Sequence, residues 1–168
     1  MTRNPIGPVL VLDGWERMAL AACRALGREG VEIGTAGHHP AEDYAARSRY
    51  ARRYHALPDP MGPITPYEHA LREVVATHGY VAIVSCHDAT LARLASITTL
   101  PAPTLSVLDD AWRRVQDKVA LADICGRLGV GYPQTERIAA SGEIDGVLKR
   151  LGAPIFVKSA QSAVASPD

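Results

Sequence analysis

Two lysines, Lys118 and Lys158, have the residue type and position best suited to holding a phosphorylated ligand. Lys118 precedes the apolar periodicity of residues 119–128, and Lys158 ends the apolar run of residues 154–157. A lysine ammonium is a mobile point charge with three donors, which suits phosphate oxygens that shift during transfer. From spacing alone, however, the favoured interpretation is two solvated lysines at the ends of regular elements.

Asp13 and Gly14 follow the first apolar run of the chain. In that place they could line the crevice at the carboxyl edge of a parallel sheet, where open α/β sheets bind ligands. A single glycine followed by the bulky Trp15 is not the glycine fingerprint of a dinucleotide site, so a Rossmann NAD site is disfavoured. The favoured interpretation is that Asp13 caps the next helix and Gly14 eases the turn.

The sequence Cys86-His87-Asp88 contains residue types found in catalytic triads. Three consecutive residues do not normally converge on one another, because a triad draws its members from separate segments. We expect Asp88 to be the N-cap of a short helix and His87 to face the crevice, where it would contact substrate. No residue is assigned a catalytic role.

The remaining histidines lack the ligand spacing of a zinc site, so no metal site is predicted among His38, His39, His55 and His69. The densest basic run covers residues 47–53. We assign Arg52 and Arg53 to a solvated surface. For Arg49, both that surface and binding of an acidic substrate or phosphate remain open.

Short apolar runs alternate with helical stripes over residues 8–108, which predicts the elements that would position these side chains. Strands are expected at 9–12, 31–34, 54–57, 81–85 and 104–108, and helices at 15–30, at 67–78 and after Asp88. A loop with prolines at 58, 60, 63 and 66 precedes the second helix. The fold class is therefore α/β, a Rossmann-like parallel sheet of four or five strands with helices on both faces.

Residues 109–168 form a second, smaller part. We expect a helical turn at 109–112, helices at 119–128 and 144–151, and a strand at 154–158. This part is too small to bury a core of its own. The predicted domains are therefore 1–108 and the incomplete opening of another domain, 109–168. Its exposed apolar surface favours self-association, of which a homodimer is one form, although the sequence does not set the oligomeric state.

Composition excludes several classes of function. Among 168 residues, 18 Lys and Arg balance 18 Asp and Glu, which disfavours a nucleic-acid partner, and the aromatic fraction of 5% disfavours a base-stacking platform. No apolar run approaches the roughly 20 residues of a membrane helix, so no membrane partner is expected. Three cysteines without CxxC spacing fit buried thiols in a reducing cytoplasm.

Three stretches taken in order resemble the ATP-grasp superfamily, which includes biotin carboxylase and carbamoyl phosphate synthetase. Residues 13–27, beginning Asp13-Gly14-Trp15, look like the first strand–turn–helix of its N-terminal domain. Asp117-Lys118, followed by Leu128-Gly129-Val130-Gly131-Tyr132-Pro133-Gln134-Thr135, is similar to the start of its nucleotide-binding domain. Pro154-Ile155-Phe156-Val157-Lys158 resembles the strand whose lysine reaches the ATP phosphates. Ser48-Arg49-Tyr50 matches a recurring segment of related proteins.

The resemblance implies an ATP-dependent carboxylate–amine ligase. Such enzymes use ATP and magnesium to phosphorylate a carboxylate, and an amine then attacks the acyl phosphate. Lys118 and Lys158 would bind ATP. Asp13, Gly14, Arg49, His87 and Asp88 are tentative substrate-binding residues.

One feature of the sequence departs from the family. Residues 159–168, after Lys158, contain no glycine, whereas the family commonly has a glycine-rich flap there. The family's magnesium-binding carboxylates would lie beyond Asp168. We therefore expect the front part of a longer enzyme, with ATP and Mg²⁺ as cofactors of the whole and neither bound tightly by these residues. The alternative function is a non-catalytic, Rossmann-like ligand-binding or interaction module.

Overall fold

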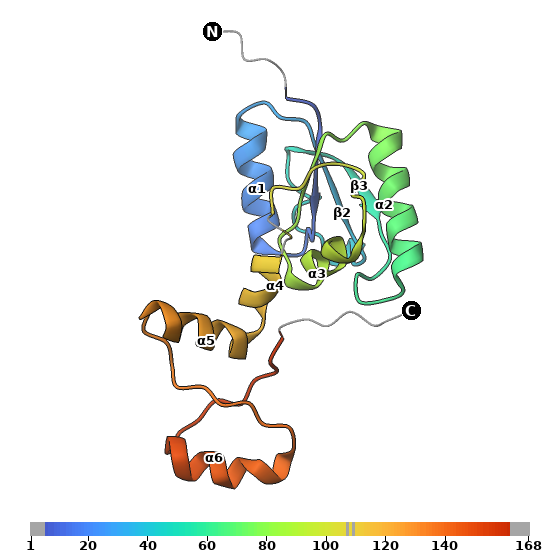
Figure 1. The fold of residues 1–168 in the computed structure, drawn as a ribbon. Coiled ribbons are helices and arrows are strands. Elements are labelled where there is room, and N and C mark those ends of the chain that lie inside the picture. The colour runs from blue at the N-terminus through green and yellow to red at the C-terminus, as the bar shows by residue number, and fades with distance from the viewer. Residues whose placement is uncertain (1–5, 107, 109, 162–168) are drawn as a thin grey trace. The chain divides into compact units, whose positions relative to one another are not determined.

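A computed structural model describes residues 6–106, 108 and 110–161 of the chain. The described chain divides after Leu108 into two compact units. The first contains the strands β1–β4 and the helices α1–α3, and the second contains the helices α4–α6 (Figure 1).

Four parallel strands in the order β3-β2-β1-β4 form the centre of the first unit. β1 (Val9–Leu12) lies between β2 (Ile33–Gly37) and β4 (Ala82–Val84), and β3 (Ala51–Ala56) pairs with β2 at the edge. All three pairings are parallel, so the predicted parallel α/β sheet is confirmed. Of the fifth strand expected at 104–108, the described residues 104–106 and 108 show only a parallel bridge between Thr104 and Ile83.

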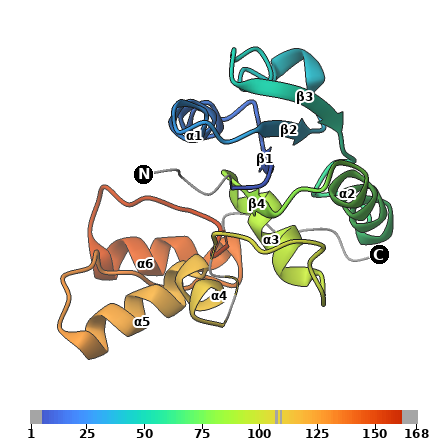
Figure 2. The same ribbon diagram turned by 90° about the horizontal axis from the view of Figure 1, so that it is seen from above.

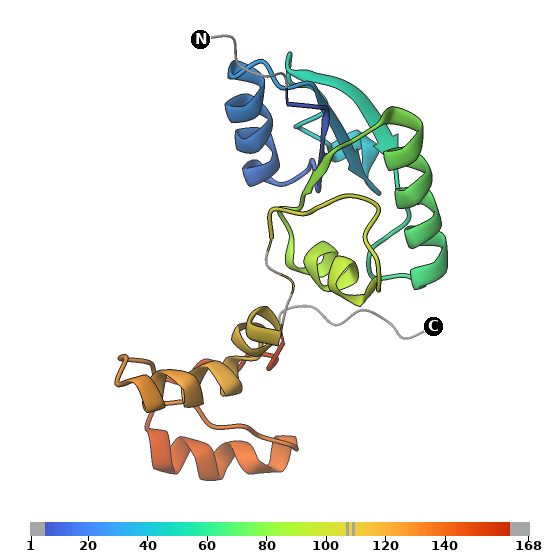
Figure 3. The ribbon, with the colours of Figure 1, turned by 45° about the horizontal axis from the view of Figure 1, so that its top comes forward.

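Helices cover both faces of this sheet, as predicted. Figures 2 and 3 show α1 (Arg17–Arg28) on one side and α2 (Ile64–His78) on the other. The side chains at 9 and 11 of β1 join the cluster formed with α1. Those at 10 and 12 join the cluster formed with α2 and α3 (Asp88–Ser96). Successive strand side chains point to opposite faces, and a hydrophobic cluster covers each face. β1 is therefore buried along its whole length.

Several element boundaries differ from the predictions. β2 extends three residues beyond the predicted end at 34, and β3 begins at Ala51, within the basic run. β3 is an edge strand, so Arg52 and Arg53 are exposed while belonging to the sheet. α2 begins at Ile64 and includes Pro66, which the first turn accommodates because its N–H groups have no intrahelical partner. A short 3₁₀ turn, η1 (Pro40–Glu42), lies between β2 and β3.

The second unit consists of α4 (Asp110–Gln116), α5 (Lys118–Leu128) and α6 (Ile144–Leu151), the last preceded by the 3₁₀ turn η2 (Ser141–Glu143). The Asp117 carboxylate caps α5 by accepting bonds from the N–H groups of residues 119 and 120 at 2.9 and 3.0 Å. Among the side chains that the structure describes in this unit, Val147 alone is buried. The unit therefore has only a small core.

The strand predicted at 154–158 is wrong. These residues form no regular element, and Phe156 and Val157 are 88% and 62% exposed. A strand needs a neighbouring strand to share its backbone hydrogen bonds. In the described part of the chain no strand runs beside these residues, and the nearest pairing joins Ala160 and Gln161 to residues 117–118.

Candidate functional site

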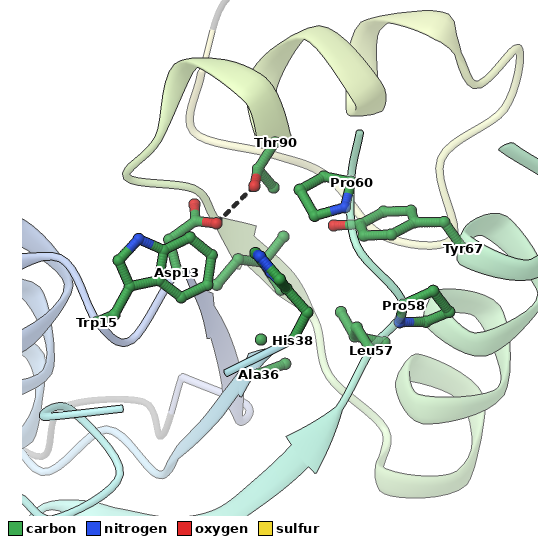
Figure 4. Close-up of a pocket in the computed structure, with 11 residues that line it drawn as sticks. Asp13, Trp15, Ala36, His38, Leu57, Pro58, Pro60, Tyr67 and Thr90 are labelled. Carbon is green, nitrogen blue, oxygen red and sulfur yellow. Dashed lines mark hydrogen bonds between the residues drawn. The ribbon is translucent and has the colours of Figure 1, made fainter. Parts of the chain in front are cut away.

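A small pocket lies at the carboxyl edge of the sheet, where β1, β2 and β3 end. The pocket is lined by one residue just beyond the end of each strand: Asp13 after β1, His38 after β2 and Pro58 after β3. Tyr67 of α2 and Thr90 of α3 complete this part of the lining (Figure 4). The cavity volume is about 10 Å³, which is enough for a water molecule, and the cavity is partly open to solvent. Open parallel sheets bind ligands at this edge, so the pocket is the candidate functional site.

Asp13 is the central polar group of the site and is only 2% exposed. Its carboxylate accepts hydrogen bonds from the Ser85 hydroxyl at 2.9 Å, the Cys86 N–H at 2.9 Å and the Thr90 hydroxyl at 2.5 Å. Burial raises the pKa of this carboxyl above its ordinary value, although the three hydrogen bonds lower it. The predicted helix cap is wrong: Glu16 occupies the N-cap position of α1, and the Asp13 side chain points across the sheet edge instead.

These bonds connect two neighbouring strands at the point where the sheet reverses its winding. β1 is followed by α1 on one face, whereas β4 is followed by α3 on the opposite face. In open sheets the crevice between two such strands is a usual ligand position. Asp13 has φ 63°, a left-handed conformation that aspartate tolerates better than most residues. The Asp13 side chain reaches across this crevice from β1 to the segment that follows β4. The pocket lies beside its carboxylate on the face of the sheet that α2 covers, because Tyr67 of α2 lines it.

Gly14 is required by a close approach. A Cβ atom at this position would lie 2.0 Å from Oδ1 of Asp43, whose side chain is itself buried. Asp43 Oδ1 accepts from the Ala46 N–H at 2.6 Å, and the Ala45 N–H donates to the Gly14 carbonyl at 2.9 Å. Gly14 thus holds the β2–β3 connection against the β1–α1 turn, and a direct contact between Gly14 and a ligand stays a prediction.

Trp15 lies beside the pocket among three histidine rings. Its ring centroid is 4.7 Å from that of His38 and 5.9 Å from those of His39 and His87. His38 Nε2 lies 4.0 Å from Asp59 Oδ1, and its Nδ1 is buried without a hydrogen-bond partner. Burial and the neighbouring His39 lower the pKa of His38, which favours the neutral ring.

The structure places His87, and not Asp88, at the N-cap of α3. The His87 Nδ1 accepts from the Ala89 N–H at 3.3 Å, and Asp88 is the first helical residue, with an exposed side chain. The predicted Asp88 cap is therefore wrong by one position. At that first position its negative charge still interacts favourably with the helix dipole. His87 does lie at the carboxyl edge, next to Trp15.

The loop between β3 and α2 forms one wall of the pocket through Leu57, Pro58 and Pro60. Arg93 of α3, only 3% exposed, fixes this loop. Its Nε donates to the Pro60 carbonyl at 2.8 Å, and its terminal nitrogen donates to the Gly62 carbonyl. The wall is held in two ways: the proline rings restrict the backbone of the loop, and the Arg93 guanidinium bonds its carbonyl groups.

Neither cysteine near the site is a ready nucleophile. Burial, with the charge of Asp43, raises the pKa of the Cys23 thiol to about 12. Burial, with the charge of Asp13, raises that of Cys86 to about 11. The thiolate is the reactive form, and these environments disfavour it. All three cysteines are free thiols, and only Cys23 is fully buried.

Arg49 lies away from the other tentative substrate-binding residues. It precedes β3, at the amino edge of the parallel sheet, whereas Asp13, Gly14 and His87 lie at the carboxyl edge. Its exposed guanidinium donates to the Tyr50 hydroxyl at 2.7 Å and lies 4.8 Å from the centroid of that ring. The five predicted residues therefore do not form one cluster.

The two predicted ATP-binding lysines lie on neighbouring segments of the second unit. The Lys118 N–H donates to the Ala160 carbonyl at 2.9 Å, and Asp117 bridges Gln161 in antiparallel fashion. Lys158 is exposed and lies two residues before this contact. The fold thus brings the first residue of α5 next to the segment that carries the second lysine.

Sequence reasoning missed most of the pocket. Trp15, His38, Tyr67 and Thr90 were not assigned to it, because they come from four separate segments with no shared spacing. The four-proline loop, which breaks regular structure just after a strand, was the one sequence signal available for the pocket wall.

Within residues 6–106, 108 and 110–161, no group of three or more His, Cys, Asp or Glu side chains is arranged to hold a metal ion. None of the described helices is long and apolar enough to cross a membrane. No protein-family model matches this chain, and no curated protein is recognisably similar to it in sequence.

Proposed function

We propose that this chain is the N-terminal part of an ATP-dependent carboxylate–amine ligase that acts through an acyl phosphate. The first unit would be its Rossmann-like domain, with a substrate subsite at Asp13 and His87, and the second unit the start of an ATP-grasp domain. The observation that carries the proposal is the pairing of residues 117–118 with residues 160–161. It draws together the two segments whose lysines would contact the nucleotide.

The proposed chemistry has two steps. A carboxylate oxygen of the acid attacks the γ-phosphorus of ATP, the bond from that phosphorus to the bridging oxygen breaks, and ADP leaves. The amine nitrogen then attacks the acyl carbon, the carbon–oxygen bond breaks, and inorganic phosphate leaves while the nitrogen loses a proton. ATP bound with Mg²⁺ supplies the phosphoryl group.

The protein's own contribution would be positioning and charge. Lys118 and Lys158 would place ammonium groups against the phosphate oxygens, where negative charge is concentrated. The Asp117 side chain holds the first turn of α5 through two backbone hydrogen bonds, which fixes the backbone position of Lys118. Lys158 lies on a segment with no regular structure, so its ammonium can follow the phosphates as they move.

ATP binding by three lysine variants tests the proposal. Lys118, Lys149 and Lys158 are the only lysines of the chain, and Lys149 is an exposed residue of α6 that serves as a matched control. We expect saturation-transfer NMR to detect ATP binding near the millimolar range, about −4 kcal/mol. Lys118→Ala and Lys158→Ala should each weaken it severalfold, whereas Lys149→Ala should leave it unchanged. Equal effects of all three variants, or no binding, would contradict the nucleotide site.

The alternative, a non-catalytic ligand-binding module, is favoured by one observation. The pocket at the carboxyl edge is lined entirely by residues of the first unit, which has its own sheet and two hydrophobic clusters. Such a module would bind its ligand with the same affinity in Lys118→Ala and Lys158→Ala variants and would show no response to ATP.

A further inference from the structure

We propose that the pocket beside Asp13 binds a primary ammonium group, the protonated end of an amine. Identifying that amine as a substrate of the ligase rests on the proposed function. The binding itself does not, because it uses side chains of the first unit only.

The charge around the pocket favours a cation. Asp13 is the one carboxylate in the lining, which includes no lysine or arginine. The nearest buried cation, Arg93, has its guanidinium directed at the carbonyls of Pro60 and Gly62. The Tyr67 hydroxyl points into the pocket (Figure 4), and burial, together with the Asp13 charge, raises its pKa above the ordinary value. A carboxylate or phosphate would be repelled here.

Unused hydrogen-bond acceptors match the three N–H groups of an ammonium. A carboxylate offers about four acceptor positions. Asp13 Oδ2 accepts two bonds and Oδ1 accepts one, so Oδ1 keeps one position. The buried Nδ1 of His38 has no partner, and in the neutral ring it can be the acceptor. The Tyr67 hydroxyl oxygen is the third acceptor at the pocket.

Shape and aromatic surface restrict the ligand further. The cavity is small, about 10 Å³, which suits a primary ammonium better than a bulkier quaternary ammonium. The Trp15 ring lines the pocket beside Asp13 (Figure 4), and an aromatic face attracts a cation. The walls at Leu57 and Pro58 are apolar, which suits the carbon chain that follows the nitrogen.

A fluorescence titration tests this site. Trp15 and Trp112 are the only tryptophans, so a Trp112→Phe background makes emission report on Trp15. At about pH 8, we expect methylammonium chloride to change the emission saturably. Sodium acetate, potassium chloride and tetramethylammonium chloride at equal ionic strength should not. An equal response to potassium or tetramethylammonium, a response to acetate, or no saturable response to methylammonium would overturn the proposal.

Two variants locate the binding. Asp13→Asn removes the charge, and Tyr67→Phe removes only a hydroxyl, so the second remains informative if the first fails to fold. Each should weaken methylammonium binding, by at least about tenfold for Asp13→Asn and severalfold for Tyr67→Phe. Asp123→Asn, at an exposed position of α5, is the matched control and should have no effect. Unchanged binding in a folded Tyr67→Phe or Asp13→Asn variant would contradict the assignment. Loss of ATP binding in the lysine variants would leave this result unaffected.

Discussion

At the scale of single residues, Asp13 experiences two opposing influences on its pKa. Burial favours the neutral acid, whereas the donors of Ser85, Cys86 and Thr90 favour the carboxylate, and burial is the larger influence. A carboxyl group whose folded-state pKa is raised contributes stability that is fully present below the unfolded-state pKa. That stability is lost as the pH rises through the folded-state pKa.

The Asp13→Asn variant should therefore change how stability depends on pH. The asparagine side chain has no proton to lose, so the variant does not lose this stability as the pH rises. The free energy of unfolding of the variant minus that of the unsubstituted protein should therefore increase with pH from about pH 3 and become constant above the raised pKa. A constant offset from altered hydrogen bonding is separable because it does not vary with pH. Urea unfolding at several pH values measures the difference. A pH-independent difference would show that the Asp13 pKa is not raised.

Arg93 is a second buried polar residue, and its guanidinium donates hydrogen bonds to the loop carbonyls of Pro60 and Gly62. Arg93→Met retains an apolar stem but leaves these carbonyls without their donors, so we expect a loss of about 2–3 kcal/mol in the free energy of unfolding. Arg72→Met is the control, because Arg72 is partly exposed and bonds Glu68 and the Thr99 carbonyl. It should lose less than about 1 kcal/mol. Similar losses for both variants would argue against the role of Arg93.

At the scale of elements, hydrophobic periodicity predicted the central strands and the helices within a few residues. β1 and β4 were found because both are short, apolar and fully or partly buried. The start of β3 was missed because an edge strand can expose charged residues, so Arg52 and Arg53 resembled a surface loop. The strand at 154–158 was predicted from an apolar run, but an apolar run does not by itself supply a pairing partner.

The candidate site was less predictable than the elements. For Asp13 a place at the sheet edge was considered but a helix cap was favoured, and its partners Ser85 and Thr90 lie 72 and 77 positions further along the chain. Only the parallel pairing of β1 with β4 brings them together, and no local spacing encodes that contact. His38 and Tyr67 reach the pocket through the ends of β2 and the start of α2 for the same reason.

Two glycines in different elements should respond oppositely to substitution by alanine. A Cβ on Gly34 of β2 would lie 1.7 Å from the Tyr80 hydroxyl oxygen, which bonds His55 Nε2 at 2.7 Å. Gly34→Ala should therefore destabilise the first unit by about 1–3 kcal/mol through overpacking. Gly126 of α5 has open space around it, so Gly126→Ala should stabilise its helix by about 0.5–1 kcal/mol. Thermal unfolding followed by circular dichroism distinguishes the two, and stabilisation by Gly34→Ala would contradict the packing described for β2.

At the scale of the whole molecule, the two units differ in the size of their hydrophobic cores. The first has a buried sheet with a hydrophobic cluster on each face. In the second, Leu128 is 71% exposed, and ion pairs such as Arg150 with Glu136 at 2.6 Å lie on the surface. Exposed ion pairs contribute little stability. We therefore expect hydrogen exchange to be slow at β1 and β2 and fast throughout α5, and uniform protection across both units would contradict this difference.

The proposed function requires that the paired segments of the second unit hold a nucleotide. The most direct measurement is an amide NMR titration of the full chain with ATP and Mg²⁺ up to about 10 mM, with inorganic phosphate as the control for general anion binding. We expect saturable shifts at residues 117–120 and 158–161, no shifts at Asp13 or His38, and a weaker response to phosphate. Shifts confined to the carboxyl-edge pocket, or none at any residue, would contradict it.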